Sequence, residues 1–263
     1  MKSLMFKKVY FFFSSLFIFL LHLPFVFAKT NPINKTTSTQ SPQPVISTAV
    51  ANTANVAANI YDSLRLGSLG LARQVFDYAM TGLTYMKEAG KVANENIISI
   101  VDFSKPSTQK RLYILDLKHY KVLFNTYVAH GMNSGQAFAN NFSNIPESNQ
   151  SSLGFYSTSG TYTGKNGYSM YLNGIEKGIN DKAHERAIVM HGAPYVSEGM
   201  IRTKGYLGRS WGCPAVMEKL NKPIIDKIKN GTCLFIYSPN KNYLAHSAIL
   251  KKRNYSSDIA YNN

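Results

Sequence analysis

Two stretches decide the fold of this chain: Ala187-Ile188-Val189-Met190-His191-Gly192 and Gly208-Arg209-Ser210-Trp211-Gly212-Cys213-Pro214-Ala215. The first is apolar and β-branched, which is typical of a buried strand, and it ends at a histidine. The second is rich in glycine, which predicts a tight turn that presents Cys213. A free cysteine has a pKa of roughly 8.5, and a nearby imidazole increases its thiolate fraction. The two stretches therefore predict a thiol nucleophile, Cys213, with His191 as its base.

Strand-like runs on both sides of this pair predict a sheet. The runs are rich in β-branched and aromatic residues, and they lie at 97–103, 111–116, 122–130, 170–172 and 233–237. The last run is expected to close the sheet. The Gly/Ser/Asn-rich segment from Gly131 to Gly167 predicts long irregular loops, and a helix is expected over 216–229. The chain is thus predicted to be mainly β, of the α+β class, with flanking helices.

The amino-terminal composition predicts export. Residues 1–28 carry Lys2, Lys7 and Lys8, then an apolar stretch, and end in Val26-Phe27-Ala28, which together predict a signal peptide cleaved after Ala28. An uncleaved anchor is the alternative, because about 20 apolar residues span a bilayer. No second long apolar stretch follows, so no stable membrane span is expected after cleavage.

Four further segments follow the signal. Residues 29–58 lack aromatic side chains and are expected to be a flexible linker. Leucine, methionine and phenylalanine recur at helical spacing within 59–95, which predicts amphipathic helices packed on the domain that follows. The catalytic domain is predicted over 96–240, and 241–263 is expected to be a basic polar tail.

Charge and cysteine content limit the partners. The formal net charge of the chain is +15. The predicted signal contributes three lysines and no acidic residue to it. Basic residues do not form a stripe with interleaved aromatic side chains, so nucleic acid is not expected as a partner, whereas anionic envelope polymers are. Cys213 and Cys233 allow a disulfide in an oxidising compartment. Cys233 lies in an apolar run, which favours a buried strand residue instead.

The motifs around the cysteine resemble a known family. His191-Gly192 followed by Ser210-x-Gly212-Cys213 resembles the catalytic domains of L,D-transpeptidases, called YkuD-like domains. Further motifs resemble the murein L,D-transpeptidase branch: His130-Gly131-Met132-Asn133-Ser134-Gly135, Phe142-Ser143-Asn144 and Ser151-Ser152-Leu153-Gly154-Phe155-Tyr156. The resemblance spans about 97–237. It implies a β-sandwich with flanking helices, located in a bacterial periplasm or envelope, that acts on peptidoglycan stem peptides.

The resemblance also implies roles for individual residues. Cys213 would attack a stem-peptide carbonyl and form a thioester, His191 would take the thiol proton, and Ser210 would orient the imidazole or else stabilise the turn. Backbone N–H groups of Trp211, Gly212 and Cys213 are candidates for an oxyanion hole. Candidate substrate contacts are Gly192, Arg209, His130 and Tyr195. No cofactor is expected, and no metal, because a His-Glu-x-x-His motif is absent from the sequence.

One departure from the family and several alternatives stay open. Better-known members carry an arginine where this chain has Ala215, so Arg209 or Arg202 is expected to supply the charge, unless both are solvated loop residues. Water as the acceptor would make the same site an L,D-carboxypeptidase or endopeptidase. An inert Cys213 would leave a non-catalytic wall-binding protein. The Ser-x-x-Lys match at Ser107 lacks the companion motifs of serine acyltransferases.

Overall fold

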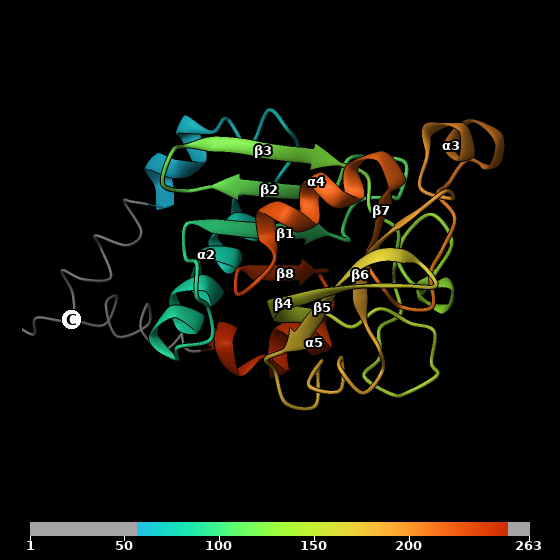
Figure 1. Ribbon diagram of the computed structural model, residues 1–263. Coiled ribbons are helices and arrows are strands. Elements are labelled where there is room, and N and C mark those ends of the chain that lie inside the picture. The colour runs from blue at the N-terminus through green and yellow to red at the C-terminus, as the bar shows by residue number, and fades with distance from the viewer. Residues whose placement is uncertain (1–56, 252–263) are drawn as a thin grey trace, which may run out of the picture. The chain divides into compact units, whose positions relative to one another are not determined.

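The computed structural model describes residues 57–251 (Figure 1). Its strands form one hydrogen-bonded sheet of eight, in the order β3-β2-β1-β8-β4-β5-β6-β7. They are β1 Ile97–Asp102, β2 Leu112–Asp116, β3 Lys121–Thr126, β4 Gly154–Gly164, β5 Gly167–Gly174, β6 Val189–Ala193, β7 Ala215–Met217 and β8 Cys233–Tyr237. The predicted mainly β architecture with helices is confirmed. The predicted signal peptide lies outside the described residues, as does the linker up to residue 56.

Helices flank this sheet. Residues 57–63 are helical, and the named elements are α2 Arg73–Glu88, α3 Glu198–Lys204, α4 Glu218–Ile228, α5 Lys241–His246 and the short 3₁₀ helix η1 Met132–Ser134. Figure 1 shows α3 set apart from the sheet, beyond the end where β7 lies. Between residues 57 and 251, no helix combines the length and the apolar character needed to cross a membrane.

Strand β8 occupies the middle of the sheet. It pairs in parallel with β1 and antiparallel with β4, and every residue of it is buried. The rings of Phe155 and Phe235 stack across β4 and β8 with centroids 4.2 Å apart. The prediction that 233–237 closes the sheet is therefore wrong, because a continuous apolar run indicates burial on both faces without indicating which strands lie beside it.

Strand β4 falls inside the segment expected to be loops. The expectation holds for 135–153, but residues 154–164 form an eleven-residue strand that pairs with β8 and β5. Its Ser, Thr and Gly residues are more typical of loops than of strands. A bulge between Thr158 and Thr161 also interrupts the alternation of inward and outward side chains. The turn at Lys165-Asn166 joins it to β5, so the two strands form a hairpin.

The two long helices cover opposite faces of the sheet. On α2, Gly82 lies against the ring of Phe155, and an added Cβ would come within 1.9 Å of it. In the same strand, the hydroxyl of Thr158 donates to the carbonyl of Ile228 at the end of α4, at 2.5 Å. Residues an odd number apart in a strand point to opposite faces. Strands β1 and β8 and the first half of β4 are thus buried between helices, which gives the sheet a rigid centre.

The carboxyl-terminal helix packs into the core. Tyr243 of α5 is buried, and its hydroxyl donates to Glu176 Oε2 at 3.1 Å, while Ser247 donates to the other carboxylate oxygen. Ile249 and Leu250 are also buried. The prediction of a polar tail over 241–263 is therefore wrong for 241–251, because a few apolar residues among many polar ones suffice to dock this segment; 252–263 lie outside the described residues.

Candidate active site

The predicted cysteine and histidine lie on neighbouring segments at the β6–β7 edge of the sheet. His191 lies in β6, is 4% exposed, and pairs in the parallel β6–β7 ladder with Ala215. Cys213 lies two residues before Ala215 and is half-buried. Because neighbouring parallel strands hold equivalent positions side by side, the ladder keeps the turn that carries the cysteine next to the strand that carries the histidine.

The imidazole of His191 is held in one tautomer. Its Nδ1 lies 2.9 Å from the carbonyl oxygen of Gly192. A carbonyl only accepts, so Nδ1 carries the hydrogen, and the lone pair of the neutral ring is on Nε2. Burial lowers the pKa of His191, and the bond to Gly192 opposes that shift. The ring is therefore neutral at pH 7 and able to accept a proton.

The sulfur of Cys213 faces backbone groups of the segment that leads into β6. Its Sγ donates to the carbonyl of Ala187 at 3.7 Å. Burial raises the pKa of this thiol, while the N–H of Val189 and the charge of Arg186 lower it. Within 57–251, no hydrogen bond joins this sulfur to His191. The resting pair is thus a neutral thiol beside a neutral imidazole.

Cys233 differs from Cys213 in its accessibility. It lies in β8 and is fully buried, and burial raises the pKa of its thiol. Both cysteines are free in the structure. Because Cys213 is half-buried and Cys233 is fully buried, Cys213 is the one of the two that a substrate can reach.

The turn that presents Cys213, residues 210–213, is closed by Ser210. The hydroxyl of Ser210 donates to the carbonyl of Cys213 at 2.6 Å and accepts the N–H of Gly212 at 3.1 Å. These contacts agree with the turn-stabilising alternative for Ser210. They also correct the predicted oxyanion hole, because the N–H of Gly212 is already used inside the turn and does not point at a substrate.

The pattern of the L,D-transpeptidase catalytic domain matches residues 68–237, which is more than half of the chain. This chain belongs to the L,D-transpeptidase catalytic domain family. A search of curated protein sequences finds no match.

Several solved structures resemble this L,D-transpeptidase domain. An L,D-transpeptidase from Mycobacterium smegmatis is 10% identical, over 54% of this chain and 59% of that chain, with a TM-score of 0.34. One from Stackebrandtia nassauensis is 14% identical, over 63% and 65%, with a TM-score of 0.34. A helical cell shape determining protein from Campylobacter jejuni is 13% identical, over 70% and 63%, with a TM-score of 0.37. The chain spans less than two thirds of the length of each, and likeness at this level says nothing of activity.

One of the predicted substrate contacts of this L,D-transpeptidase domain is wrong. His130 is 1% exposed; its Nδ1 accepts from Arg111 at 2.7 Å and its Nε2 bonds to Gly135 O at 3.2 Å. Burial, and then the charge of Arg111, lower the pKa of His130 to about 3. His130 instead braces the 131–135 loop. The side-chain position of Gly192 faces α4, because an added Cβ would lie 2.9 Å from Asn221. The carbonyl of Gly192 orients His191, and a contact of Gly192 with substrate stays a prediction.

Tyr195 and Arg209 remain candidates for contact with substrate. Burial raises the pKa of the Tyr195 hydroxyl to about 12, and the charge of Cys213 adds to the shift, so this side chain lies within electrostatic reach of the sulfur. Arg209 donates to the carbonyls of Met132 and Gly135 at 3.2 and 3.1 Å. Trp211, next to Gly212, is 72% exposed, so its side chain is available to a ligand.

No motif in the sequence singles out Arg186. Among the described residues, its charge is the side-chain charge that lowers the pKa of the Cys213 thiol. Arg202, expected as an alternative source of charge, is exposed on α3 and pairs with Glu198 at 4.0 Å. Arg186 lies five residues before His191, just ahead of the strand that carries the histidine. This closeness in sequence is the one feature that could have suggested a place for Arg186 near the site.

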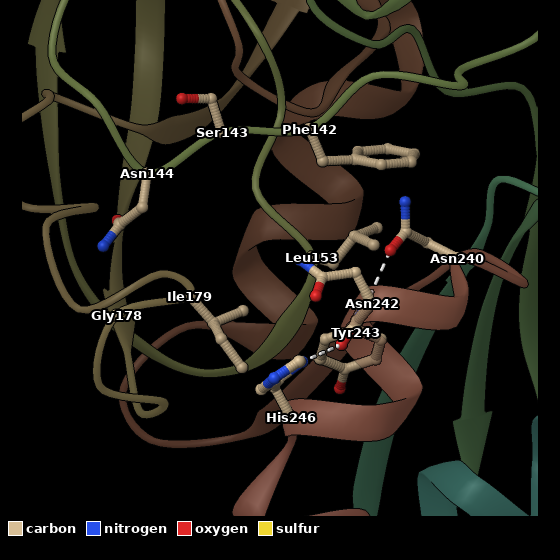
Figure 2. Close-up of a pocket in the computed structure, with 10 residues that line it drawn as sticks. All are labelled: Phe142, Ser143, Asn144, Leu153, Gly178, Ile179, Asn240, Asn242, Tyr243 and His246. Carbon is tan, nitrogen blue, oxygen red and sulfur yellow. Dashed lines mark hydrogen bonds between the residues drawn. The ribbon is translucent and has the colours of Figure 1, made fainter.

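A separate cavity of about 160 Å³ lies away from the predicted site residues (Figure 2). Figure 2 shows it between the 142–144 segment, the loop at Gly178 and Ile179, and helix α5. Its wall contains none of the residues predicted for catalysis or substrate contact. Among residues 57–251, no three His, Cys, Asp or Glu side chains gather in a way that could hold a metal ion.

Proposed function

We propose that this protein is an exported cysteine acyltransferase that joins peptidoglycan stem peptides by L,D-transpeptidation. One observation carries the proposal: a neutral imidazole, fixed through Nδ1 on Gly192, stands on the strand beside a turn that presents the more accessible thiol. Membership of the L,D-transpeptidase catalytic domain family supports peptidoglycan as the polymer. Export follows from the predicted signal at 1–28, and the basic charge favours residence in an anionic envelope.

Acylation begins with a proton transfer. The thiol of Cys213 turns from the Ala187 carbonyl toward His191, and Nε2 takes its proton. The thiolate attacks the carbonyl that follows the third stem residue, and an S–C bond forms. The tetrahedral intermediate collapses as the C–N bond breaks, and the amine of the terminal D-alanine leaves with the proton from His191.

Deacylation repeats the steps with a second stem peptide. Its amine attacks the thioester, His191 accepts the proton that the amine loses, and the thiolate leaves and is protonated again. The oxyanion of each intermediate needs fixed donors, for which the N–H groups of Trp211 and Cys213 remain the candidates. Water in place of the amine would give a tripeptide by hydrolysis.

Product analysis by mass spectrometry tests this proposal. The full chain, a Cys213→Ala variant and a matched Cys233→Ala variant are each incubated with purified tetrapeptide muropeptides. We expect cross-linked dimers from the wild type and from Cys233→Ala, and none from Cys213→Ala. Tripeptide without dimers would identify a hydrolase instead. Equal products from the wild type and Cys213→Ala would refute the assignment of the nucleophile.

A further inference from the structure

The side chain of Arg186 gathers the loop formed by residues 143–152. Its Nη1 donates to the carbonyl of Ser143 at 2.7 Å and to the hydroxyl of Ser152. Its Nη2 donates to the hydroxyl of Ser148 at 3.1 Å and to the carbonyl of Gln150 at 2.7 Å. A planar guanidinium presents its N–H groups in a rigid fork, so a single side chain sets the shape of this loop.

The gathered loop packs against the turn that carries Cys213. An atom at the Cβ position of Gly212 would lie 2.7 Å from the Gln150 carbonyl and 3.4 Å from Arg186 Nη2. On the other side of the same residue, the hydroxyl of Ser151 donates to the Gly212 carbonyl at 3.0 Å. The guanidinium therefore lies directly against the residue that precedes the cysteine.

Arg186 has no carboxylate partner in the part of the chain that the structure describes. The ion pairs formed between residues 57 and 251 do not include it, and all four of its hydrogen-bond partners are neutral oxygens. Its Nε is buried without a hydrogen-bond partner among these residues. Burying part of a cation with only neutral partners costs stability, because its desolvation is not offset by an opposite charge. This cost would be offset if an anion formed next to Arg186 during function.

The charged and titratable groups around the sulfur leave one source of positive charge. His191, on β6 beside the cysteine turn, is a neutral ring, and Tyr195, from the loop after β6, keeps its hydroxyl proton because burial raises its pKa to about 12. Arg209 is directed to the carbonyls of the 131–135 loop. Arg186 is the cation that acts on the thiol.

We propose that Arg186 is the positioning residue of the thiol site, which holds the 143–152 loop against the cysteine turn and stabilises the thiolate of Cys213 with its charge. The inference rests on the proposed function in one respect, that Cys213 is the nucleophile. Burial raises the pKa of this thiol, and Arg186 works against that rise.

Alkylation of Cys213 by iodoacetamide across pH 6–11 tests the proposal on the full chain. The rate is followed by mass mapping of the peptide that contains Cys213, and it measures the thiolate fraction at each pH. Removing a nearby opposite charge shifts a pKa by about 1 unit or more. We expect Arg186→Gln to raise the thiol pKa and to slow alkylation at pH 7 about tenfold. The exposed Arg202→Gln variant is the matched control and should titrate like the wild type.

Arg186→Lys separates the two parts of the role. Lysine keeps the charge but not the fork, so the thiol pKa should stay near that of the wild type while cross-linking activity falls. If Arg186→Gln titrates like the wild type, the charge does not stabilise the thiolate and the proposal is overturned. If Arg186→Gln does not fold, unchanged cross-linking by Arg186→Lys overturns it. The titration needs no substrate, so its result is independent of the test of the proposed function.

Discussion

Replacing Gly212 by alanine should damage both stability and activity, and the structure indicates how much. The φ angle of Gly212 is +124°, a conformation that L-residues rarely adopt, and holding alanine there costs roughly 1–3 kcal/mol. The added methyl would also lie 2.7 Å from the carbonyl oxygen of Gln150, which is backbone and cannot swing away. Overpacking of this kind costs about 1–3 kcal/mol.

The two costs together predict a loss of about 3 kcal/mol or more in the free energy of unfolding. In a domain of this size each kcal/mol lowers Tm by about 2–4 °C, so Tm should fall by about 6–12 °C. Relief of the clash must move the turn, and Cys213 follows directly. A displacement of about 1 Å at a reacting group costs about 100-fold in rate, so cross-linking should fall by that factor.

Two other glycines provide matched controls for this prediction. Gly205 has a φ of +76° with nothing within 4 Å of an added Cβ, so Gly205→Ala tests the backbone cost alone, about 1 kcal/mol. Gly160 has neither a positive φ nor a close neighbour, so Gly160→Ala should change stability by less than about 0.5 kcal/mol. Thermal unfolding followed by circular dichroism and the cross-linking assay compare the three. Equal Tm and equal activity for Gly212→Ala and Gly205→Ala would refute the clash.

Three further predictions concern the scaffold. Gly82→Ala should lower the free energy of unfolding by about 2 kcal/mol, because the added methyl group overlaps Phe155. Gly199→Ala, at an open helix position, should raise it by about 0.5 kcal/mol. Urea titration measures both changes, and the same sign for both would contradict this prediction. His130, whose folded pKa is about 3, should lower the free energy of unfolding of the wild type by about 2 kcal/mol at pH 5 relative to pH 7. The reason is that the unfolded ring binds a proton below about pH 6.5 and the folded ring does not. His130→Gln should remove that pH dependence. Glu176, whose pKa is raised by burial, should have the opposite effect on stability. Its contribution to the free energy of unfolding is complete below the unfolded pKa of about 4.3 and declines as the pH rises toward the folded pKa. The stability of the wild type relative to Glu176→Gln should therefore fall from about pH 4 upward, and a flat difference would show that the carboxyl group is not held protonated.

The local chemistry of the site follows from the sequence. A β-branched run ending in His191 and a glycine-rich turn around Cys213 each depend on neighbours within a few residues, so periodicity and turn composition predict them. The buried position of Cys233 follows in the same way from its apolar run. The mainly β class was also predictable, since most strands carry their own pattern.

Only the tertiary structure decided which distant groups meet at that site. Arg186 approaches the cysteine turn because the 143–152 loop folds back on it. His130 is buried away from substrate, where Arg111, the residue before β2, donates a hydrogen bond to its ring nitrogen. Strand β8 lies at the centre of the sheet because of its pairing with β1 and β4. Composition and period describe a segment's own preference for burial or turn, whereas these contacts join residues far apart in the chain, and their energies appear only when the whole core is packed.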